Sequence, residues 1–167
     1  QTLNSKPILS LQGSPILKRT VKAALAVLKP PPDLTISDWA DQNRRLSSEA
    51  SAEPGQWRTS RAEYQRGIMD AISDPAAETV VIMSSSQIGK SESLLNMVGF
   101  HIDHDPAPIM VVMPTERDAE TWSKDRFSPM ARDTPCLQDK IANPKSRDGN
   151  NKILHKRFPG GHLTIVG

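Results

Sequence analysis

The sequence has few of the features that tie a protein to an oxidising compartment or to a membrane. It contains a single cysteine, Cys136, so no disulfide bond can form within the chain, as suits a reducing cytosol. A lone thiol is more often a small packing residue than a reactive nucleophile. No apolar run approaches the ~18–20 residues of a membrane span, and the N-terminus lacks the compact apolar core of a signal peptide. These absences predict a protein of the cytoplasm without a membrane anchor.

Acidic residues are missing from the first 32 positions, although the net charge of the 167-residue chain is only +2. The basic residues of that segment are Lys6, Lys18, Arg19, Lys22 and Lys29. A second basic cluster near the C-terminus consists of Lys140, Lys145, Arg147, Lys152, Lys156 and Arg157. Segments of this kind bind DNA phosphates in some proteins and form ordinary solvated surface in others. The sequence leaves both interpretations open for each cluster.

The most specific pattern lies in residues 79–91. The apolar run from Val80 to Met83 predicts a buried strand, and small polar residues lead from it to Gly89-Lys90-Ser91. A helix that begins near Gly89 would direct backbone N–H groups and its positive dipole end toward phosphates. Lys90 would reach the β- and γ-phosphates, and the Ser91 hydroxyl would ligate Mg²⁺. The pattern therefore predicts a site for a nucleoside triphosphate with its metal ion.

The match to the phosphate-loop pattern G-x-x-x-x-G-K-[ST] is incomplete, because Ser84 stands at the first glycine. Gly-Lys-Ser also occurs by chance, in an ordinary strand-to-helix turn with a surface lysine. The context favours phosphate binding, since an apolar run comes directly before the loop. Apolar residues for the buried face of a helix follow the loop, namely Leu94, Leu95, Met97 and Val98.

Spacing and capping signals predict the remaining elements. A helix is expected over 15–29 with Ser14 as N-cap, and a second over 37–46. A third is expected over 60–72, with the capping box Ser60-x-x-Glu63. A fourth should begin at Thr115, with Asp118 three residues on as in another capping box. Strands are expected over 109–113 and on both sides of the turn Pro159-Gly160-Gly161, over 153–158 and 162–166, with an exposed loop over 133–150. The order strand, helix, strand, helix predicts an α/β fold with a parallel sheet and a right-handed crossover.

Two further groups of side chains have alternative interpretations. Tyr64-Gln65 precedes the phosphate loop, and an aromatic ring with an amide could bind adenine, although a core tyrosine beside a solvated glutamine is the commoner arrangement. The metal-capable side chains His101, Asp103, His104 and Asp105 fall within five residues. Their position at the expected end of a helix explains them better than a metal site does, because no second ligand motif accompanies them.

The motifs together resemble the large terminase subunit of tailed bacteriophages, and most closely the lambda-type (GpA) family of packaging ATPases. The likeness extends from about Pro31 to the last residue. It rests on Ile36-Ser37-Asp38-Trp39-Ala40, Arg44-Arg45-Leu46, Pro54-Gly55, Trp57-Arg58-Thr59, Tyr64-Gln65, Met69-Asp70, residues 85–91, Met113-Pro114-Thr115, Ala119, Trp122-Ser123, Arg126 and Pro129-Met130. Each motif alone is weak, but their order and spacing agree with the family.

The resemblance implies a P-loop NTPase of the ASCE type, a three-layer α/β sandwich with a helical N-terminal extension. Residues 1–32 would be a basic tail and helix with the linker Pro30-Pro31-Pro32, and residues 33–167 would be the front portion of the ATPase domain. It implies ATP and Mg²⁺ as cofactors, Lys90 as the catalytic cation and Ser91 as the metal ligand. The residues implied to bind the nucleotide are Tyr64, Gln65, Ser85, Ser86, Gln87, Ile88, Gly89, Lys90 and Ser91.

The full-length family uses ATP to pump double-stranded DNA into a capsid and carries an endonuclease. The resemblance therefore implies double-stranded DNA, a small terminase subunit and the capsid portal as partners. It also implies a homo-oligomer during packaging and the host bacterial cytoplasm as the location. Pro114-Thr115 resembles the element that couples nucleotide state to DNA in helicase-like ATPases.

The sequence departs from the family in two respects. Many terminases carry an arginine in the loop where Ser86 stands here, so the cation that stabilises the transition state would come from elsewhere, such as a neighbouring subunit. The chain also has no apolar strand ending in Asp-Glu, the Walker B segment, and no nuclease domain. These departures predict a sandwich that is incomplete at its C-terminal side, as in a truncated gene or prophage remnant.

Such a fragment would bind ATP with little or no hydrolysis. The alternative is a non-catalytic module that binds DNA or the small terminase subunit through residues 1–32, with an idle phosphate loop.

Overall fold

The computed structural model describes residues 15–27, 33–49, 51–141 and 152–167. The chain divides into two compact units, residues 1–33 and residues 34–167. Within the described residues, no helix has both the length and the apolar character needed to cross a membrane.

The first unit contains one described helix, α1 (Pro15–Val27). The helix begins at the predicted proline, which suits a first helical position because its missing N–H has no partner to lose there. The predicted N-cap Ser14, the predicted end at Lys29 and the proline linker lie outside the described residues. Leu17 and Leu25 are exposed, and so are the basic side chains of this helix, Lys18, Arg19 and Lys22.

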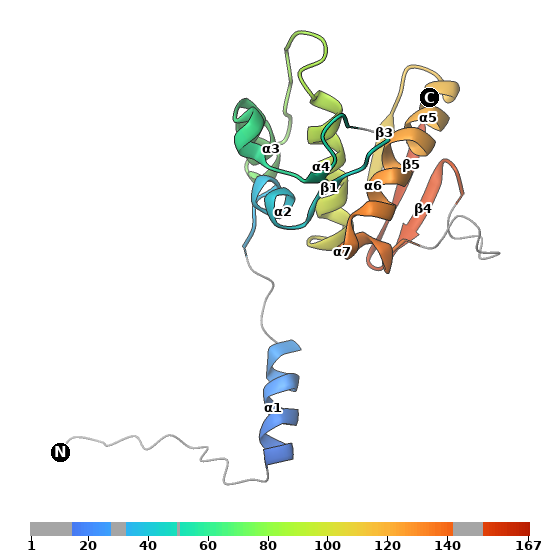
Figure 1. The fold of residues 1–167 in the computed structure, drawn as a ribbon. Coiled ribbons are helices and arrows are strands. Elements are labelled where there is room, and N and C mark those ends of the chain that lie inside the picture. The colour runs from blue at the N-terminus through green and yellow to red at the C-terminus, as the bar shows by residue number, and fades with distance from the viewer. Residues whose placement is uncertain (1–14, 28–32, 50, 142–151) are drawn as a thin grey trace. The chain divides into compact units, whose positions relative to one another are not determined.

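Three helices of the second unit pack against one another (Figure 1): α2 (Ile36–Asn43), α3 (Tyr64–Ser73) and α4 (Lys90–Asp103). The side chain of Thr35 caps α2 by accepting from Asp38 N, and the Asp38 carboxylate accepts from Thr35 N. The predicted end of this helix at Leu46 is wrong. Arg44 is already extended, and strand β1 (Arg45–Leu46) pairs antiparallel with β2 (Gly55–Gln56), so tertiary pairing overrides the local helical pattern.

The predicted capping box at Ser60 is also absent. A 3₁₀ turn, η1 (Thr59–Ala62), precedes α3, and no side chain caps either element. Thr59 is buried, its N–H donates to Asp41 Oδ1 over 2.6 Å, and its hydroxyl accepts from Trp57 Nε1 over 3.0 Å. These contacts bind the start of the segment to α2, so its first turn follows tertiary partners rather than the local motif. α3 ends at Ser73, one residue past the predicted end at residue 72, and Asp74 follows it in an extended conformation.

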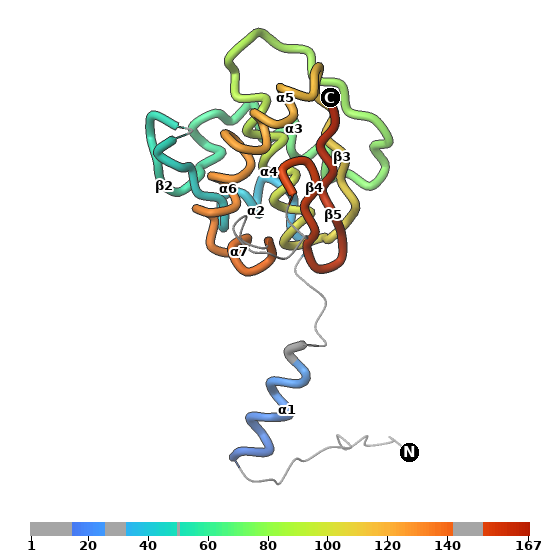
Figure 2. Tube along the Cα trace, turned by 90° about the vertical axis from the view of Figure 1, so that its right-hand side faces the viewer, coloured from blue at the N-terminus to red at the C-terminus, as the bar shows by residue number. Residues whose placement is uncertain are grey.

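The sheet of the second unit has the strand order β3-β5-β4 (Figures 1 and 2), with β3 (Ile109–Val112), β4 (His155–Phe158) and β5 (Gly161–Val166). The predicted hairpin is confirmed: β4 pairs antiparallel with β5 across a turn in which Gly160 has a φ of +86°. β3 pairs parallel with β5. One face of the sheet is buried through Ile109, Phe158, Leu163 and Ile165.

The predicted strand over Val80–Met83 is wrong, and with it the parallel pairing of this segment with residues 109–113. Residues 79–85 are irregular, and the side chains of Val81 and Met83 are 82% and 96% exposed. A strand needs a neighbour to accept its backbone hydrogen bonds, and no strand of the described residues pairs with this segment. The sheet is therefore mixed, and β5 takes the parallel position beside β3.

A run of short helices follows β3: α5 (Glu116–Trp122), a π turn η2 (Ser123–Phe127), α6 (Ser128–Asp133) and α7 (Pro135–Gln138). The predicted cap is confirmed, because the Thr115 side chain accepts from Asp118 N over 3.1 Å. The predicted loop over 133–150 is wrong where α7 forms, and residues 142–151 lie outside the described part. Cys136 is half-buried, and burial raises the pKa of its thiol to about 12, which fits a packing residue.

Trp39 of α2 packs onto α4 at Gly99. A Cβ at position 99 would lie 2.4 Å from the indole ring, so only glycine permits this approach. The buried indole also donates from Nε1 to Asp103 Oδ2 over 2.7 Å, and Lys140 donates from Nζ to Asp103 Oδ1 over 2.7 Å. One carboxylate at the end of α4 thus holds α2 and the segment after α7.

Lys156 of β4 points into the interior, where its side chain is 4% exposed. Its Nζ donates to the carbonyls of Lys152 and Ile153 and lies 5.8 Å from the centre of the Phe127 ring. Burial disfavours the ammonium and lowers the pKa of Lys156 from 10.5 to about 8. Burying Lys156 therefore lowers the stability of the fold as long as its amino group is protonated.

The stability of the second unit should therefore rise with pH between about 8 and 10.5. In that window the unfolded chain keeps the Lys156 proton and the folded chain loses it, whereas below pH 8 both keep it. Urea denaturation across this range should give a positive slope in the free energy of unfolding. The total gain over this window should be a few kcal/mol at most, and the slope should be smaller in Lys156→Met. Equal slopes in the two proteins would contradict this assignment.

Candidate functional site

The phosphate-loop residues lead into α4 through two left-handed backbone positions. Gly89 is the N-cap of α4 with a φ of +83°, and Gln87 has a φ of +60°. No side chain caps the start of the helix. A helix with bare N-terminal N–H groups and a positive dipole end is suited to bind an anion.

Lys90 and Ser91 form the first turn of α4, as the sequence predicted. The Lys90 ammonium reaches back over the loop and donates to the Ser85 carbonyl over 2.6 Å. An ammonium carries three donors, so this bond leaves two for a ligand. Ser91 is exposed, and so are the predicted loop residues Ser85, Ser86 and Gln87. The cation and the hydroxyl thus lie beside an open loop.

Tyr64 and Gln65, which the resemblance assigned to adenine, lie against the loop. The Tyr64 hydroxyl donates to the Ile88 carbonyl over 2.8 Å, and Gln65 Nε2 donates to the same carbonyl over 3.0 Å. The Tyr64 ring is otherwise exposed, which leaves its face open for stacking. Gln65 is 5% exposed, and its buried Oε1 has no hydrogen-bond partner among the described residues. Both side chains therefore position the loop, and one acceptor remains.

Gly89 and Gln65 are packed so closely that a side chain cannot be added between them. A Cβ on Gly89 would lie 2.3 Å from Gln65 Nε2. The positive φ already disfavours any other residue at this position. Two constraints therefore act on the loop at Gly89: its left-handed backbone and the close packing of Gln65 from α3.

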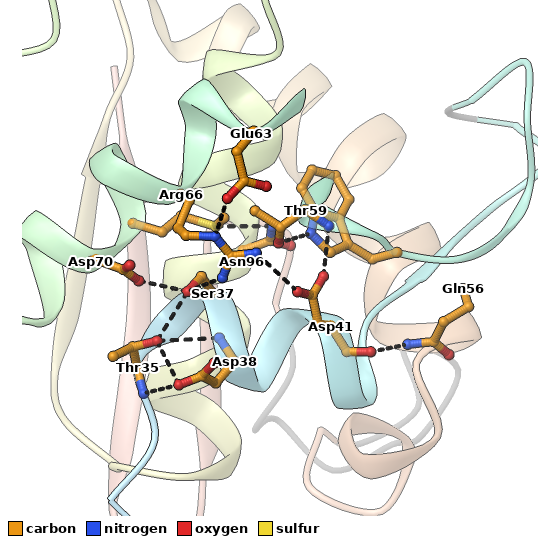
Figure 3. A network of polar contacts seen from close by, with 12 residues as sticks. Thr35, Ser37, Asp38, Asp41, Gln56, Thr59, Glu63, Arg66, Asp70 and Asn96 are labelled. Carbon is orange, nitrogen blue, oxygen red and sulfur yellow. Dashed lines mark hydrogen bonds and ion pairs between the residues drawn. The ribbon is translucent and has the colours of Figure 1, made fainter. Parts of the chain in front are cut away.

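A polar network holds α3, the carrier of Tyr64 and Gln65, onto α2 (Figure 3). The Ser37 hydroxyl donates to Asp70 Oδ1 over 2.6 Å, and the Ser73 hydroxyl accepts from Ile36 N over 2.8 Å. Arg66 pairs with Glu63 at 2.5 Å and lies 3.8 Å from Asp41. The contacts of Ser37, Ser73 and Asp41 cross between the two helices, and they therefore set where Gln65 meets the loop.

Sequence reasoning missed one buried contact next to the loop. Arg44 is 2% exposed, and its Nη2 pairs with Glu92 Oε2 of the first turn of α4 at 3.0 Å. Burial lowers the pKa of Arg44, and the Glu92 carboxylate opposes that shift. In the sequence, Arg44 is only one residue of the motif Arg44-Arg45-Leu46 on which the resemblance rests. Its partner is remote in the chain, so no local signal could have found the pair.

The metal-capable cluster at the C-terminal end of α4 makes structural contacts. Asp103 accepts from Trp39 and Lys140, and His101 Nδ1 lies 3.0 Å from the Asp105 carbonyl oxygen. Within the described ranges, no group of three or more His, Cys, Asp or Glu side chains could hold a metal ion. The predicted Mg²⁺ ligand Ser91 would therefore need phosphate oxygens as its companions.

The residues present fit a nucleoside triphosphate. The uncapped start of α4, the glycine that keeps side chains away from the backbone, and the Lys90 ammonium suit phosphates. The unpartnered Gln65 Oε1 suits an amino donor such as the exocyclic amine of adenine. The individual roles of these residues remain predictions.

Comparisons with known proteins agree with these features. Residues 51–167 match the family model of the ATPase domain of the phage terminase large subunit gpA. The chain is 31% identical over 145 residues to the terminase large subunit of Escherichia phage lambda, an alignment that covers 87% of the chain and 22% of the relative. It is 29% identical over 137 residues to the terminase large subunit of Enterobacteria phage P21, covering 82% of the chain and 21% of the relative.

The chain thus spans about a fifth of the length of these curated relatives. No solved structure matches it.

Substituting Gly89 should strain the loop. We expect Gly89→Ala to lower the free energy of unfolding by about 1–3 kcal/mol, because it forces a side chain into a left-handed backbone position and against Gln65. Urea denaturation measures this loss. Adding Gln65→Ala removes the collision and leaves the backbone strain, so the double variant should recover only part of the loss. Full stability of Gly89→Ala alone would refute the described loop geometry.

Breaking the Arg44–Glu92 pair should also destabilise the unit. Arg44→Met keeps most of the apolar stem and removes the charge, and we expect it to cost about 3 kcal/mol because it leaves a carboxylate unpaired in a largely buried site. A double-mutant cycle with Glu92→Gln should give a coupling energy above about 1 kcal/mol. Strict additivity of the two substitutions would show that the contact contributes nothing.

Proposed function

The chain belongs to the phage terminase large subunit family and comprises part of its gpA-type ATPase domain, and from that membership we propose that it is the ATP-binding front part of a DNA-packaging motor. In the longer protein this part would use ATP with Mg²⁺ to drive double-stranded DNA into a capsid, coupled to an endonuclease. A P-loop α/β sandwich of the ASCE type is the fold proposed for that domain. Its partners would be a small terminase subunit, the capsid portal and further copies of the same chain.

The observation that carries this proposal is the loop from Ser85 to Ser91. Its backbone enters α4 without a cap, and it presents Lys90 and Ser91 on the first turn. Lys90 would neutralise the β- and γ-phosphates, and the N–H groups of residues 86–90 would cradle them. Ser91 would hold Mg²⁺, which supplies charge neutralisation and orientation of the phosphates when bound.

The nucleoside would lie on the α3 side of the loop. The exposed ring of Tyr64 offers a stacking face, and Gln65 Oε1 offers an acceptor for the amine of adenine. Because guanine carries a carbonyl at the corresponding position, the same acceptor would disfavour GTP. The described residues thus support a preference for ATP as well as a phosphate site.

A second candidate is a non-catalytic module that binds DNA or the small terminase subunit through residues 1–32. The observation in its favour is α1, a unit of its own that exposes both apolar and basic side chains. Equal affinity for a DNA duplex with and without residues 1–32 would count against DNA binding by this segment. In this alternative the phosphate loop would be idle, so nucleotide binding separates the two candidates.

Substitution of Lys90 tests the proposed site. We expect Lys90→Ala to weaken Mg·ATP binding at least about tenfold, because a charge-assisted hydrogen bond contributes roughly 1.5–3 kcal/mol. Lys124→Ala, which removes an exposed lysine remote in sequence, is the matched control and should bind like the parent chain. Calorimetric titration measures both.

Gln65→Ala tests the adenine contact separately in the same assay. Removing its hydrogen bond to the loop should weaken the binding of ATP and of GTP equally. Removing the acceptor for the adenine amine should weaken ATP more than GTP, so we expect the ratio of ATP affinity to GTP affinity to fall. ATP affinity that is unaffected by Lys90→Ala would refute the phosphate site, and an unchanged ratio in Gln65→Ala would refute the adenine contact.

A further inference from the structure

The structure divides the C-terminal basic cluster into residues with different environments. Lys140 donates to the Asp103 carboxylate and carbonyl, and Lys156 is buried beneath β4. Lys145 and Arg147 lie outside the described residues. Only Lys152 and Arg157 of the described members are exposed. Of the basic cluster in the sequence, the described part of the structure therefore leaves only Lys152 and Arg157 as an exposed basic surface.

That surface is the outer face of the β4–β5 hairpin, which we define by Lys152, His155, Arg157 and His162. Side chains alternate along a strand, so the buried Lys156 and Phe158 leave His155 and Arg157 on the opposite face. The register places Arg157 opposite His162 and His155 opposite Thr164. The rings of His155 and His162 lie 5.5 Å apart between centres. Two adjacent strands therefore present basic side chains in one continuous group.

The hairpin outer face lies at an edge of the sheet. β4 is the last strand in the order β3-β5-β4, so no further strand of the sheet flanks it, and an elongated binding partner can extend past this edge. Figure 2 shows the hairpin in red on the side of the unit away from β2. The hairpin is also separate in the chain from the phosphate loop.

Among the residues that the structure describes, no acidic side chain forms an ion pair with the exposed basic side chains of this surface, Lys152, Arg157 and His162. The pKa of His155 is lowered, first by desolvation and then by His162, Arg157 and Lys152, all of them positive or able to become so. Like charges on neighbouring strands repel one another, so a binding partner with dense negative charge would relieve that repulsion.

We propose that the outer face of the β4–β5 hairpin binds the phosphate backbone of double-stranded DNA. This inference rests on the proposed function, in which the motor acts on DNA, and it adds the surface that would hold the duplex. Lysine, arginine, imidazole and the Thr164 hydroxyl are all donors to phosphate oxygens. Outward residues two apart on a strand are separated by about 6.7 Å, and each DNA strand carries a charge about every 3.4 Å. Several donors can therefore meet phosphates together, independent of base sequence.

The test measures binding of the full chain to a short fluorescent DNA duplex by anisotropy over a series of salt concentrations. The variant Lys152→Gln with Arg157→Gln should weaken binding about tenfold at low salt. It should also reduce the slope of log affinity against log salt by about two, one unit for each lost phosphate contact. The exchange Lys152→Arg with Arg157→Lys keeps the charge and should retain the affinity.

The matched control is Arg45→Gln with Arg58→Gln, which removes the same charge from exposed positions around the β1–β2 pair. It should change the affinity and the slope less than the hairpin variant does. Circular dichroism and thermal unfolding of every variant keep a loss of fold from being read as a loss of binding.

Equal losses in the hairpin variant and the control would mean that affinity follows net charge, and this would overturn the inference. So would no measurable binding of the parent chain at low salt. Polyglutamate that competes as well as DNA at equal charge would assign the face to an acidic protein partner and overturn it too. Mg·ATP binding measured on the same variants keeps the two proposals apart. A hairpin variant with normal nucleotide affinity and normal DNA affinity refutes the DNA surface alone.

Discussion

One main-chain carbonyl, that of Ile88, connects the site to the rest of the second unit. It accepts hydrogen bonds from both Tyr64 and Gln65, and the next residue, Gly89, has no room for a side chain against the same glutamine. A loop that is exposed along most of its length is thereby held where it enters α4. The donors sit on α3, so the geometry of the loop depends on how α3 is placed.

The placement of α3 and α4 relies on polar contacts between segments remote in the sequence. Ser37 and Arg66 join α2 to α3, and Trp39 and Asp103 join α2 to α4. Arg44, the residue after α2, pairs with Glu92 in the first turn of α4. Buried polar groups are costly unless they are paired, so such contacts favour one arrangement over near alternatives. The site is held by hydrogen bonds where the loop joins α4, and its residues 85–87 are exposed.

Local signals in the sequence predicted local structure well. Thr115 caps α5 and Pro159-Gly160 turns the hairpin, because each depends on a few adjacent residues. The predictions failed where contacts with a segment remote in the sequence determine the local structure. Val80–Met83 is apolar enough for a strand, but no strand in the described part of the chain pairs with it. Thr59 bonds to Asp41 of α2 instead of starting a helix capped by Ser60. The phosphate loop is predicted from its own residues, whereas the contacts of Ile88 and Arg44 became visible only in the fold.

The pairing of β3 has a consequence for the order in which the chain can assemble during synthesis. The helices α2, α3 and α4 all lie before residue 104, so their mutual contacts become possible early. Among the described strands, β3 finds its neighbour only in β5, which begins at Gly161. Closing so long a segment is entropically slower than closing a hairpin. During synthesis, therefore, the β3 edge that pairs with β5 stays without this partner until residues 161–166 have been made.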